Sequence, residues 1–194
     1  MQLIPVEKNN LGHAIDIAST IFPHDVDEVK KYLSASINPM DKWDFADAHL
    51  VNKLHYDLLV YNCNIIGITG IYEEKIDPQI AWLGWFGLQE SYRGKRLGRL
   101  LLQLTIDSAK KAHYDCLRLW TLDHPDYYNA IHLYKNMGFI QQKLSYALEN
   151  SPVIIFSYPL TTRHVPLWNP VLHGFKLAGA MEIMQEIGER HDMS

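Results

Sequence analysis

The sequence predicts a mixed α/β domain, and two observations carry that prediction. Segments with the apolar period of amphipathic helices alternate with short runs rich in β-branched and aromatic residues, which are typical of strands. One long helical segment also connects two strand-like segments, and strands joined by such a crossover are expected to be parallel neighbours. The chain has 194 residues, about the length of one domain and enough to bury a core without disulfides or a structural metal.

The expected elements follow one another in the order β α α β β β α β α β β. Pro23 ends the first helix and Pro39 follows the second, because proline cannot continue a helix. The tripeptide Asn62-Cys63-Asn64 suits a hairpin turn. The expected strands span 2–6, 56–61, 65–72, 80–88, 116–122, 139–148 and 153–160, the expected helices span 9–22, 25–38, 97–113 and 126–137, and 38–52 is expected to be a loop or short turn of helix.

The long helix at 97–113 is expected to bury one apolar stripe. That stripe consists of Leu97, Leu100, Leu101, Leu104 and Ala112. After Leu160 a proline-containing stretch leads to another helical pattern at 171–188, which is too short to build a core of its own. The sequence therefore predicts a main domain at 1–160 and, at 161–194, an extension with a helix appended to the same domain.

Composition excludes several classes of protein. Apolar residues make up 47% and charged residues 21%, which rules out a disordered chain, a collagen and a coiled coil. The net charge of −4 disfavours non-specific nucleic-acid binding, and no apolar run reaches the roughly 18 residues of a membrane span. No secretory signal is evident, and no His-x-x-x-His or Cys-x-x-Cys pair indicates a metal site. Cys63 and Cys116 are expected to be buried thiols, which is consistent with the reducing cytoplasm.

Four cations lie between an expected strand and the start of the long expected helix. Two glycines separate them, and the segment consists of Arg93, Gly94, Lys95, Arg96, Leu97, Gly98 and Arg99. The first turn of a helix has unpaired N–H groups and a partial positive charge, so a glycine-containing loop there can bind a pyrophosphate. The order of residues matches neither a Walker loop nor the dinucleotide fingerprint. A solvated basic patch is the alternative interpretation.

Two motifs together resemble the GNAT superfamily of acyl-CoA N-acyltransferases. Residues 93–98 are similar to its Arg-Gly-x-Gly-x-Gly pyrophosphate loop, and residues 129–139 resemble its Asn, Ala, Tyr and Gly-Phe block. The resemblance covers about residues 65–160. It implies a mostly antiparallel sheet with one splayed parallel strand pair, helices on both faces, and acetyl-CoA as the cofactor. Arg96 stands where the family often has its middle glycine, and we expect helical geometry there because a positive φ is costly for arginine.

The resemblance also implies roles for backbone groups at the splayed strands. Pantetheine would lie between the strand ending at Leu88 and the strand beginning at Cys116. The backbone of Phe86 and Leu88 would contact it, with the Phe86 N–H polarising the thioester carbonyl. Gly87 would permit a bulge between them, although room for the packing of neighbouring tryptophans is an alternative reason for a glycine.

The second motif supplies side chains to the same implied site. Asn129 would bond the pantetheine amide, and Tyr134 would protonate the leaving thiolate. Lys95, Arg99 or Lys135 would meet the 3′-phosphate of CoA. Purely structural roles are the alternatives, namely helix capping for Asn129 and core packing for Tyr134.

The attacking amine must be neutral, so a general base or a water chain is needed. Family members often carry an acid four residues before the Phe86 position, where this chain has Trp82. Glu73, near the end of an expected strand, is the candidate that we select. The other candidates for the base are Glu74, Asp123 and His124, and the candidates for lining an acceptor pocket, with a core role as the alternative, are Phe22, Trp43, Trp82 and Trp85.

The expected function is therefore acetyl transfer from acetyl-CoA to a primary amine on a small molecule or peptide. We expect a cytoplasmic monomer or homodimer that binds neither nucleic acid nor membranes. The rival hypothesis is a non-catalytic acyl-CoA-binding or sensor module on the same fold. The absence of the common acid favours the rival, and Tyr134 favours the enzyme. The sequence does not specify the acceptor amine or the acyl chain preference.

Overall fold

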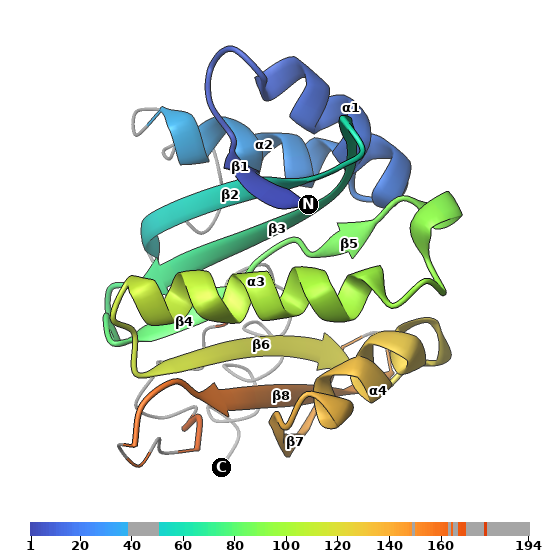
Figure 1. The fold of residues 1–194 in the computed structure, drawn as a ribbon. Helices are drawn as coiled ribbons and strands as arrows, with labels where there is room; N and C mark the ends of the chain where they lie inside the picture. The colour runs from blue at the N-terminus through green and yellow to red at the C-terminus, as the bar shows by residue number, and fades with distance from the viewer. Residues whose placement is uncertain (39–50, 149, 163, 165–166, 170–176, 178–194) are drawn as a thin grey trace.

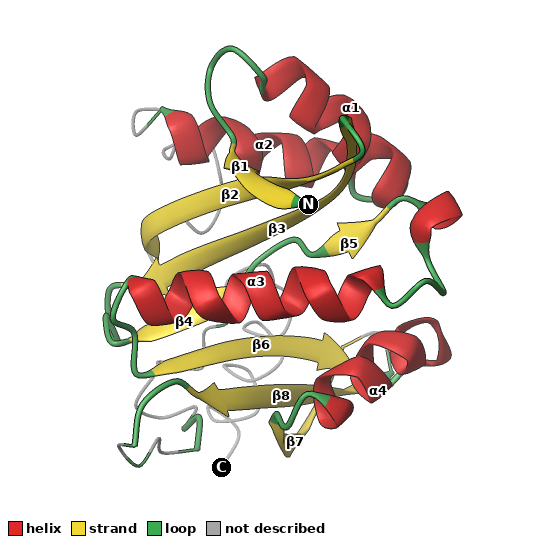
Figure 2. Cartoon of the chain, viewed as in Figure 1, coloured by secondary structure: helices red, strands yellow, loops and turns green. Residues whose placement is uncertain are grey.

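The computed structural model describes residues 1–38, 51–148, 150–162, 164, 167–169 and 177. Eight strands form one sheet within these residues, in the order β1-β2-β3-β4-β6-β8-β7, with β5 paired to β3 beside that path (Figures 1 and 2). The strands are β1 Gln2–Pro5, β2 Val51–Tyr61, β3 Asn64–Glu74, β4 Ile80–Leu83, β5 Gly87–Leu88, β6 Cys116–Leu122, β7 Ile140–Leu148 and β8 Ser151–Pro159. The α-helices are α1 Leu11–Ile21, α2 Val26–Ile37, α3 Leu97–Lys111 and α4 Tyr128–Asn136, and short 3-10 turns span Glu90–Tyr92 and Pro125–Tyr127.

The sheet is antiparallel except where β4 and β6 run parallel. These two strands are joined through α3, so the crossover predicted from the sequence is confirmed. The bounds of β6 equal those of the expected strand 116–122, and α3 begins at the expected Leu97. The expected single strand 80–88 is instead two strands, β4 and β5, separated by residues 84–86.

Helices cover both faces of the sheet. Side chains of a strand alternate between faces, and consecutive residues of β8 show this: Ile155 packs into the core beside α1 and α2, whereas Phe156 packs into the core beneath α3 and α4. Figure 1 shows α3 lying along the near face, over the strands. None of the helices in the described part of the chain is both long and apolar enough to cross a membrane.

The hairpin between β2 and β3 turns at the expected tripeptide. Asn62 and Cys63 both have positive φ, 48° and 61°, and Tyr61 pairs with Asn64. Two consecutive left-handed residues are the geometry that suits the right-handed twist of hairpin strands. This turn exposes Cys63, so the prediction that both thiols are buried is wrong for Cys63. Cys116 is buried as expected, and its burial raises the pKa of the thiol to about 11.

The buried stripe of α3 differs from the predicted one. Of the predicted residues only Leu101 is fully buried, whereas Leu100 and Ala112 are exposed. The helix is rotated so that Thr105 faces the sheet, where its hydroxyl lies 2.8 Å from that of Thr69 and donates to the carbonyl of Leu101. A polar residue whose hydrogen bonds are satisfied can occupy a core position, and that possibility is invisible to apolar periodicity. The buried residues of α3 are Leu101, Leu102, Thr105, Ile106 and Ala109.

The end of the chain is described only in part. The expected helix 171–188, apart from Leu177, and residues 39–50 of the expected loop at 38–52 lie outside the described residues. The end of that expected loop is wrong, because Val51 and Asn52 begin β2. Trp168 and Leu177 are buried in the core on the α1 and α2 side. The side-chain amide of Gln142 on β7 bonds both the N–H and the carbonyl of Trp168, at 3.0 and 2.8 Å. These contacts join this part of the extension to the sheet.

Candidate active site

The strands β4 and β6 separate at the centre of the sheet. They pair in parallel over only three positions, from Ile80 with Cys116 to Trp82 with Arg118. Beyond that point the chain continues into β5, which pairs with β3 and not with β6 (Figure 1). The expected splayed pair is therefore present, with residues 84–86 at the point where it opens.

Residues 84–86 form a bulge opposite β3. Leu83 pairs with Ile71 and Gly87 pairs with Ile68, so three residues on one strand face two on the other. The Gly84 N–H donates to the Gly70 carbonyl at 2.9 Å. The Phe86 N–H makes no hydrogen bond to any described residue. An unpaired N–H at the mouth of the splay is the group that an oxyanion site requires.

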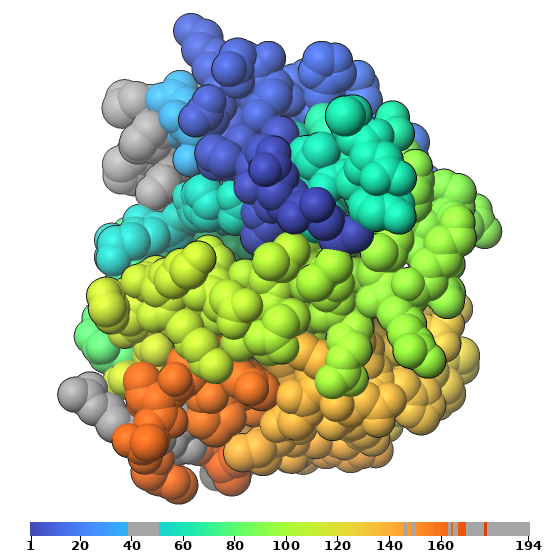
Figure 3. Space-filling model, in the orientation of Figure 1, coloured from blue at the N-terminus to red at the C-terminus, as the bar shows by residue number. Residues whose placement is uncertain are grey.

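Two cationic side chains of the segment between β5 and α3 donate hydrogen bonds to nearby backbone carbonyls. Arg93 Nε donates to the Leu88 carbonyl at 3.0 Å, and Lys95 Nζ donates to the Ser91 carbonyl at 2.8 Å. Gly94 has φ +73°, which glycine adopts without steric cost. Side chains of this stretch project from the face shown in Figure 3.

Arg96 is in the left-handed region, with φ 61° and ψ 7°, so the expectation of right-handed helical geometry there is wrong. Such a conformation costs an arginine about 1 kcal/mol or more. It directs the chain into α3, whose first backbone hydrogen bond runs from the Leu100 N–H to the Arg96 carbonyl at 3.4 Å. The N–H groups of residues 97–99 precede that bond and are free of intrahelical partners. Arg96 and Arg99 are both exposed beside them.

Gly98 lies in the first turn of α3, facing α4 and β5. A Cβ at this position would lie 3.7 Å from Leu133 Cδ2 and 3.9 Å from Leu88 Cδ1, which are ordinary van der Waals contacts. The protein itself therefore has room for a methyl group there. The space that Gly98 leaves open lies between α4 and β5, which stand on either side of the gap between the separated strands.

Tyr134 on α4 is buried among aromatic rings. Its ring centroid lies 6.5 Å from that of Phe86, 5.7 Å from Phe139 and 5.5 Å from Phe156. Burial raises the pKa of Tyr134 well above its ordinary value, so the phenol is neutral. Among the described residues no hydrogen bond engages the hydroxyl. Asn129 and Lys135 belong to the same helix and are exposed.

Aromatic residues cover the other side of the bulge. The Trp85 ring lies 5.0 Å from that of Phe22 and 6.4 Å from that of Tyr32. A Cβ on Gly87 would come within 2.5 Å of Ile21 Cγ2, so the end of α1 packs directly against this strand. Trp82 is fully buried and stacked on Tyr72, which makes it a core residue, and Trp43 lies outside the described residues.

Glu73 is not brought to this site. It pairs with Ala81 at the end of β4 that is remote from Phe86. Its buried carboxylate accepts hydrogen bonds from Lys53 at 2.8 Å, Tyr114 at 2.9 Å and Asn52. Burial raises the pKa of Glu73, but these three donors and the charge of Lys53 outweigh that effect, so the pKa is lowered.

The remaining candidates for the base are either buried or engaged in hydrogen bonds. Glu74 is buried beside Glu73 on β3. Asp123 bonds Lys143 at 2.7 Å, and His124 Nδ1 accepts from the Asp126 N–H at 3.4 Å. Asp123 and His124 both follow the end of β6, on the opposite arm of the splay from Phe86.

A family model described as the acetyltransferase (GNAT) family matches residues 20–139. That span includes α2, the bulge, the cationic loop and α4.

The chain belongs to the GNAT family of acetyltransferases.

Individual relatives within the GNAT family are distant. The chain is 27% identical over 107 residues to N-alpha-acetyltransferase 30 of Saccharomyces cerevisiae, covering 52% of this chain and 60% of that protein. It is 33% identical over 75 residues to the uncharacterized N-acetyltransferase YdgE of Bacillus subtilis, covering 38% of this chain and 46% of that protein. The matched region thus spans about half the length of these curated relatives.

Solved structures share the GNAT fold. The ribosomal-protein-S18-alanine N-acetyltransferase of Escherichia coli aligns with a TM-score of 0.58 at 18% identity, over 87% of this chain and 99% of that one. The aminoglycoside 6′-N-acetyltransferase of Enterococcus faecium aligns with a TM-score of 0.63 at 15% identity, over 85% of this chain and all of that one. At these identities the likeness concerns the fold.

Sequence reasoning missed one buried group of this GNAT site. Tyr56 on β2 reaches the bulge, and its hydroxyl accepts a hydrogen bond from the Trp85 N–H at 3.3 Å. The sequence did contain a signal for this contact. Gly70 and Gly84 each lie inside a segment that is expected to be a strand. A glycine within a strand often marks the close approach of another group.

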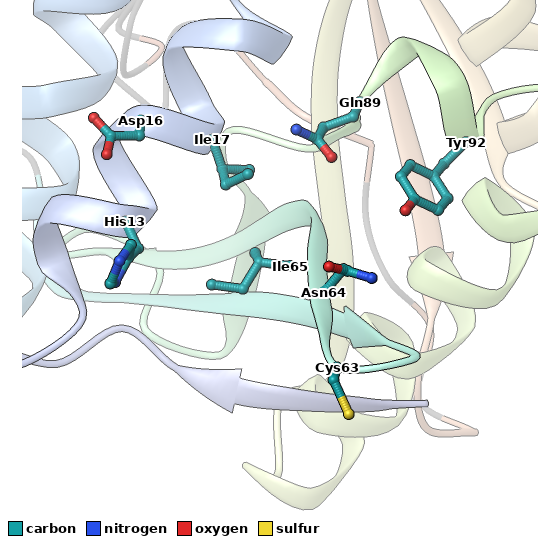
Figure 4. Close-up of a pocket in the computed structure, with 8 residues that line it drawn as sticks. All are labelled: His13, Asp16, Ile17, Cys63, Asn64, Ile65, Gln89 and Tyr92. Atoms are coloured by element: carbon teal, nitrogen blue, oxygen red, sulfur yellow. The ribbon is translucent and has the colours of Figure 1, made fainter.

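A separate hollow lies between α1 and the hairpin tip (Figure 4). It is lined by His13, Asp16, Ile17, Cys63, Asn64, Ile65, Gln89 and Tyr92. Asp16 and Cys63 point away from each other in this view.

Proposed function

We propose that this protein is an N-acetyltransferase that moves the acetyl group of acetyl-CoA to a primary amine by direct attack in a ternary complex. The observation that carries the proposal is that two groups lie at the same opening: a backbone N–H without a hydrogen-bond partner and a neutral phenol. The Phe86 N–H lies at the mouth of the splay, and the ring of Tyr134 is packed against that of Phe86. Membership of the GNAT family supports the same activity.

The loop before α3 is suited to the pyrophosphate of CoA. The N–H groups of residues 97–99 and the exposed side chains of Arg96 and Arg99 can bond phosphate oxygens. The opening at Gly98 accommodates the close approach of the cofactor between α4 and β5. Asn129 and Lys135 on α4 are assigned to the pantetheine amide and the 3′-phosphate.

The proposed reaction forms a carbon–nitrogen bond and breaks a carbon–sulfur bond. As the neutral amine attacks the thioester carbon, the Phe86 N–H stabilises the negative charge that develops on the carbonyl oxygen. The amine nitrogen loses one proton to solvent. The phenol of Tyr134, kept neutral by burial, donates its proton to the sulfur as the thiolate leaves, and the resulting phenolate takes one proton back from solvent, which balances the proton that the amine released.

The acceptor approaches from the side of α1 and α2 in this proposal. Phe22, Tyr32 and Trp85 form an aromatic wall there, next to the bulge. The two solved relatives described above act, by their names, on an alanine of a ribosomal protein and on an aminoglycoside. We accordingly assign this protein an amine acceptor on a small molecule or a peptide, and we assign Glu73 no part in the proton transfer.

A thiol-release assay tests the proposal. Acetyl-CoA is incubated with the protein and a panel of amines that includes peptides with free N-termini, polyamines and aminoglycosides, and free CoA is measured by its thiol. We expect CoA release with at least one amine, and formation of the matching amide by mass spectrometry. Tight binding of acetyl-CoA with no release for any class of amine would instead support a binding or sensor module.

A further inference from the structure

We propose that Tyr56 is a positioning residue of the acetyl-transfer site, which holds the bulge so that the Phe86 N–H faces the thioester carbonyl. This inference rests on the proposed function, and it assigns a role to a side chain on β2 that neither motif contains. The decisive contact is the hydrogen bond from the Trp85 N–H to the Tyr56 hydroxyl at 3.3 Å.

Tyr56 reaches the bulge through a path that two glycines keep clear. Its ring crosses β3 at Gly70, where a Cβ would lie 2.1 Å from ring atom Cε1. Its hydroxyl ends beside Gly84, where a Cβ would lie 2.6 Å from Oη. Atoms do not approach that closely, so side chains on either neighbouring strand would displace the phenol. The position of the Tyr56 side chain therefore depends on glycine at both 70 and 84.

The bulge creates the need for this hydroxyl. Of residues 84–86 only Gly84 donates its N–H to β3, so the N–H groups of Trp85 and Phe86 have no partner on that strand. Trp85 donates its N–H to Tyr56, which is completely buried, and this bond avoids the cost of a buried N–H without an acceptor. Burial also raises the pKa of Tyr56 well above its ordinary value, so the acceptor is a neutral phenol at every working pH.

Fixing the Trp85 N–H also fixes the peptide group that follows it. The chain before it is held by the Gly84 bond to Gly70, and the chain after it by the pairing of Gly87 with Ile68. The Trp85 ring is packed on Phe22 and Tyr32. With peptide groups planar, little rotation is left for the Phe86 N–H, and a preorganised donor is what transition-state stabilisation requires.

The test uses the carbonyl stretch of acetyl-CoA labelled with ¹³C at the thioester carbonyl, measured by infrared difference spectroscopy on the bound complex. In the wild-type protein we expect a shift to lower frequency relative to free acetyl-CoA, because a directed N–H polarises the bond. Tyr56→Phe should lose at least half of that shift, with the Kd for CoA changed by less than about threefold. Tyr61→Phe, the same deletion on the same strand, should keep the whole shift.

A second pair of variants keeps the test decisive if Tyr56→Phe folds poorly. Gly84→Ala leaves the phenol intact but places a methyl group against its hydroxyl, so it should lose the same part of the shift, whereas Gly12→Ala in α1, which meets nothing within 4 Å, should not. The losses in Tyr56→Phe and Gly84→Ala should fail to add in the double variant, because both break one contact.

Three results would overturn the inference. The full shift in Tyr56→Phe or in Gly84→Ala would show that Tyr56 only fills space. Additive losses in the double variant would show that the two residues act separately. No shift in the wild-type complex would remove the polarising role of Phe86 and the inference with it. A wild-type protein that fails to bind acetyl-CoA would instead contradict the proposed function, so the two failures are distinguishable.

Discussion

The ring of Tyr134 lies 6.5 Å from the ring of Phe86, centroid to centroid, at an interplanar angle of 52°. Phe86 belongs to the bulge that follows β4, and Tyr134 belongs to α4, which follows β6. The contact therefore joins the two arms of the splay at its open end. An N–H that can stabilise an oxyanion and a phenol that can protonate sulfur lie on opposite sides of one opening.

Replacing Tyr134 by phenylalanine should separate catalysis from packing. The ring stays among Phe86, Phe139 and Phe156, so the free energy of unfolding should change by no more than about 1 kcal/mol. Loss of a positioned proton donor typically costs about 10²–10⁴-fold in rate. We expect that loss in kcat and in kcat/KM for the amine, with the Kd for CoA nearly unchanged.

Tyr114→Phe is the matched control for that experiment. Its hydroxyl bonds Glu73 at the remote end of β4, so the variant should lose some stability and keep kcat. If Tyr134→Phe stays within about threefold of wild type, Tyr134 has no part in the proton transfer. The loss of kcat in Tyr134→Phe should also shrink at high pH, where a free thiolate is a tolerable leaving group.

Gly98→Ala should change stability and cofactor affinity in opposite directions. The methyl group meets only Leu133 and Leu88 at ordinary contact distances, and alanine in a helix is more stable than glycine by about 0.5–1 kcal/mol. The same methyl group enters the opening assigned to the cofactor, so we expect the Kd for CoA to rise about tenfold, or about 1.4 kcal/mol.

Calorimetric titration with CoA and thermal unfolding of the free protein measure both effects. Gly12→Ala provides the control, because Gly12 is the second residue of α1 as Gly98 is of α3. It should gain stability without altering CoA binding. Equal Kd values for Gly98→Ala and wild type would show that the cofactor does not approach α3 at this point.

Two substitutions of Arg96 should separate the effect of backbone strain on stability from the effect of charge on CoA affinity. Arg96→Gly relieves the left-handed conformation, whereas Arg96→Ala keeps it, so the glycine variant should be the more stable by about 1 kcal/mol. Both variants remove the same cation and should weaken CoA binding by similar factors, less so at high salt because ions screen exposed charges.

Unfolding in urea and CoA titrations at low and high ionic strength measure these differences. Arg99→Ala should weaken CoA binding with the same salt dependence and no change in loop strain. An alanine variant at Arg96 as stable as the glycine variant would contradict the assignment of strain to this residue.

The sequence was most informative where one local signal decides the outcome. The run from Cys116 to Leu122 is mostly apolar, with Arg118 and Thr121 as its polar residues, and its bounds were predicted without error. The position of the cationic loop between a strand and α3 was likewise predicted from the neighbouring residues. These features depend on patterns of a few residues.

Long-range contacts account for what was missed. Arg96 takes a left-handed conformation that its own propensity disfavours, since the junction between loop and helix fixes it. The hydroxyl of Thr105 is satisfied by Thr69, 36 residues away, which rotates the buried face of α3. Glu73 was selected as the base by its place on a strand, and the sequence did not show that three donors from distant segments engage its carboxylate; its catalytic role stays a prediction. Such partners are visible only after the chain has folded.

Glu73→Gln tests whether that carboxylate stabilises the fold or takes part in the reaction. Its pKa is below the ordinary value of 4.5 in the folded protein, so the folded state favours the ionised form. Its contribution to the free energy of unfolding is therefore complete above about pH 4.5 and is lost as the pH falls through the lowered pKa.

The glutamine variant lacks this contribution at every pH. Because the carboxylate is almost fully buried and accepts from a charged lysine, we expect Glu73→Gln to be less stable than wild type at pH 7 by about 2 kcal/mol. The difference should shrink as the pH falls from about 4.5 toward 3. Urea unfolding at pH 7 and at pH 3.5 measures it, and Glu90→Gln, an exposed carboxylate in the turn after β5, is the control that should show no such loss.

The activity of the same variant decides the mechanistic question. If Glu73 only anchors Lys53, Tyr114 and Asn52, the folded variant should keep kcat within about threefold of wild type at pH 7, with an unaltered pH profile. A base in the reaction would behave differently, because its removal costs about 10²–10⁴-fold and flattens the acidic limb of the profile. A loss of that size in a variant shown to be folded at the assay temperature would return Glu73 to the proton transfer.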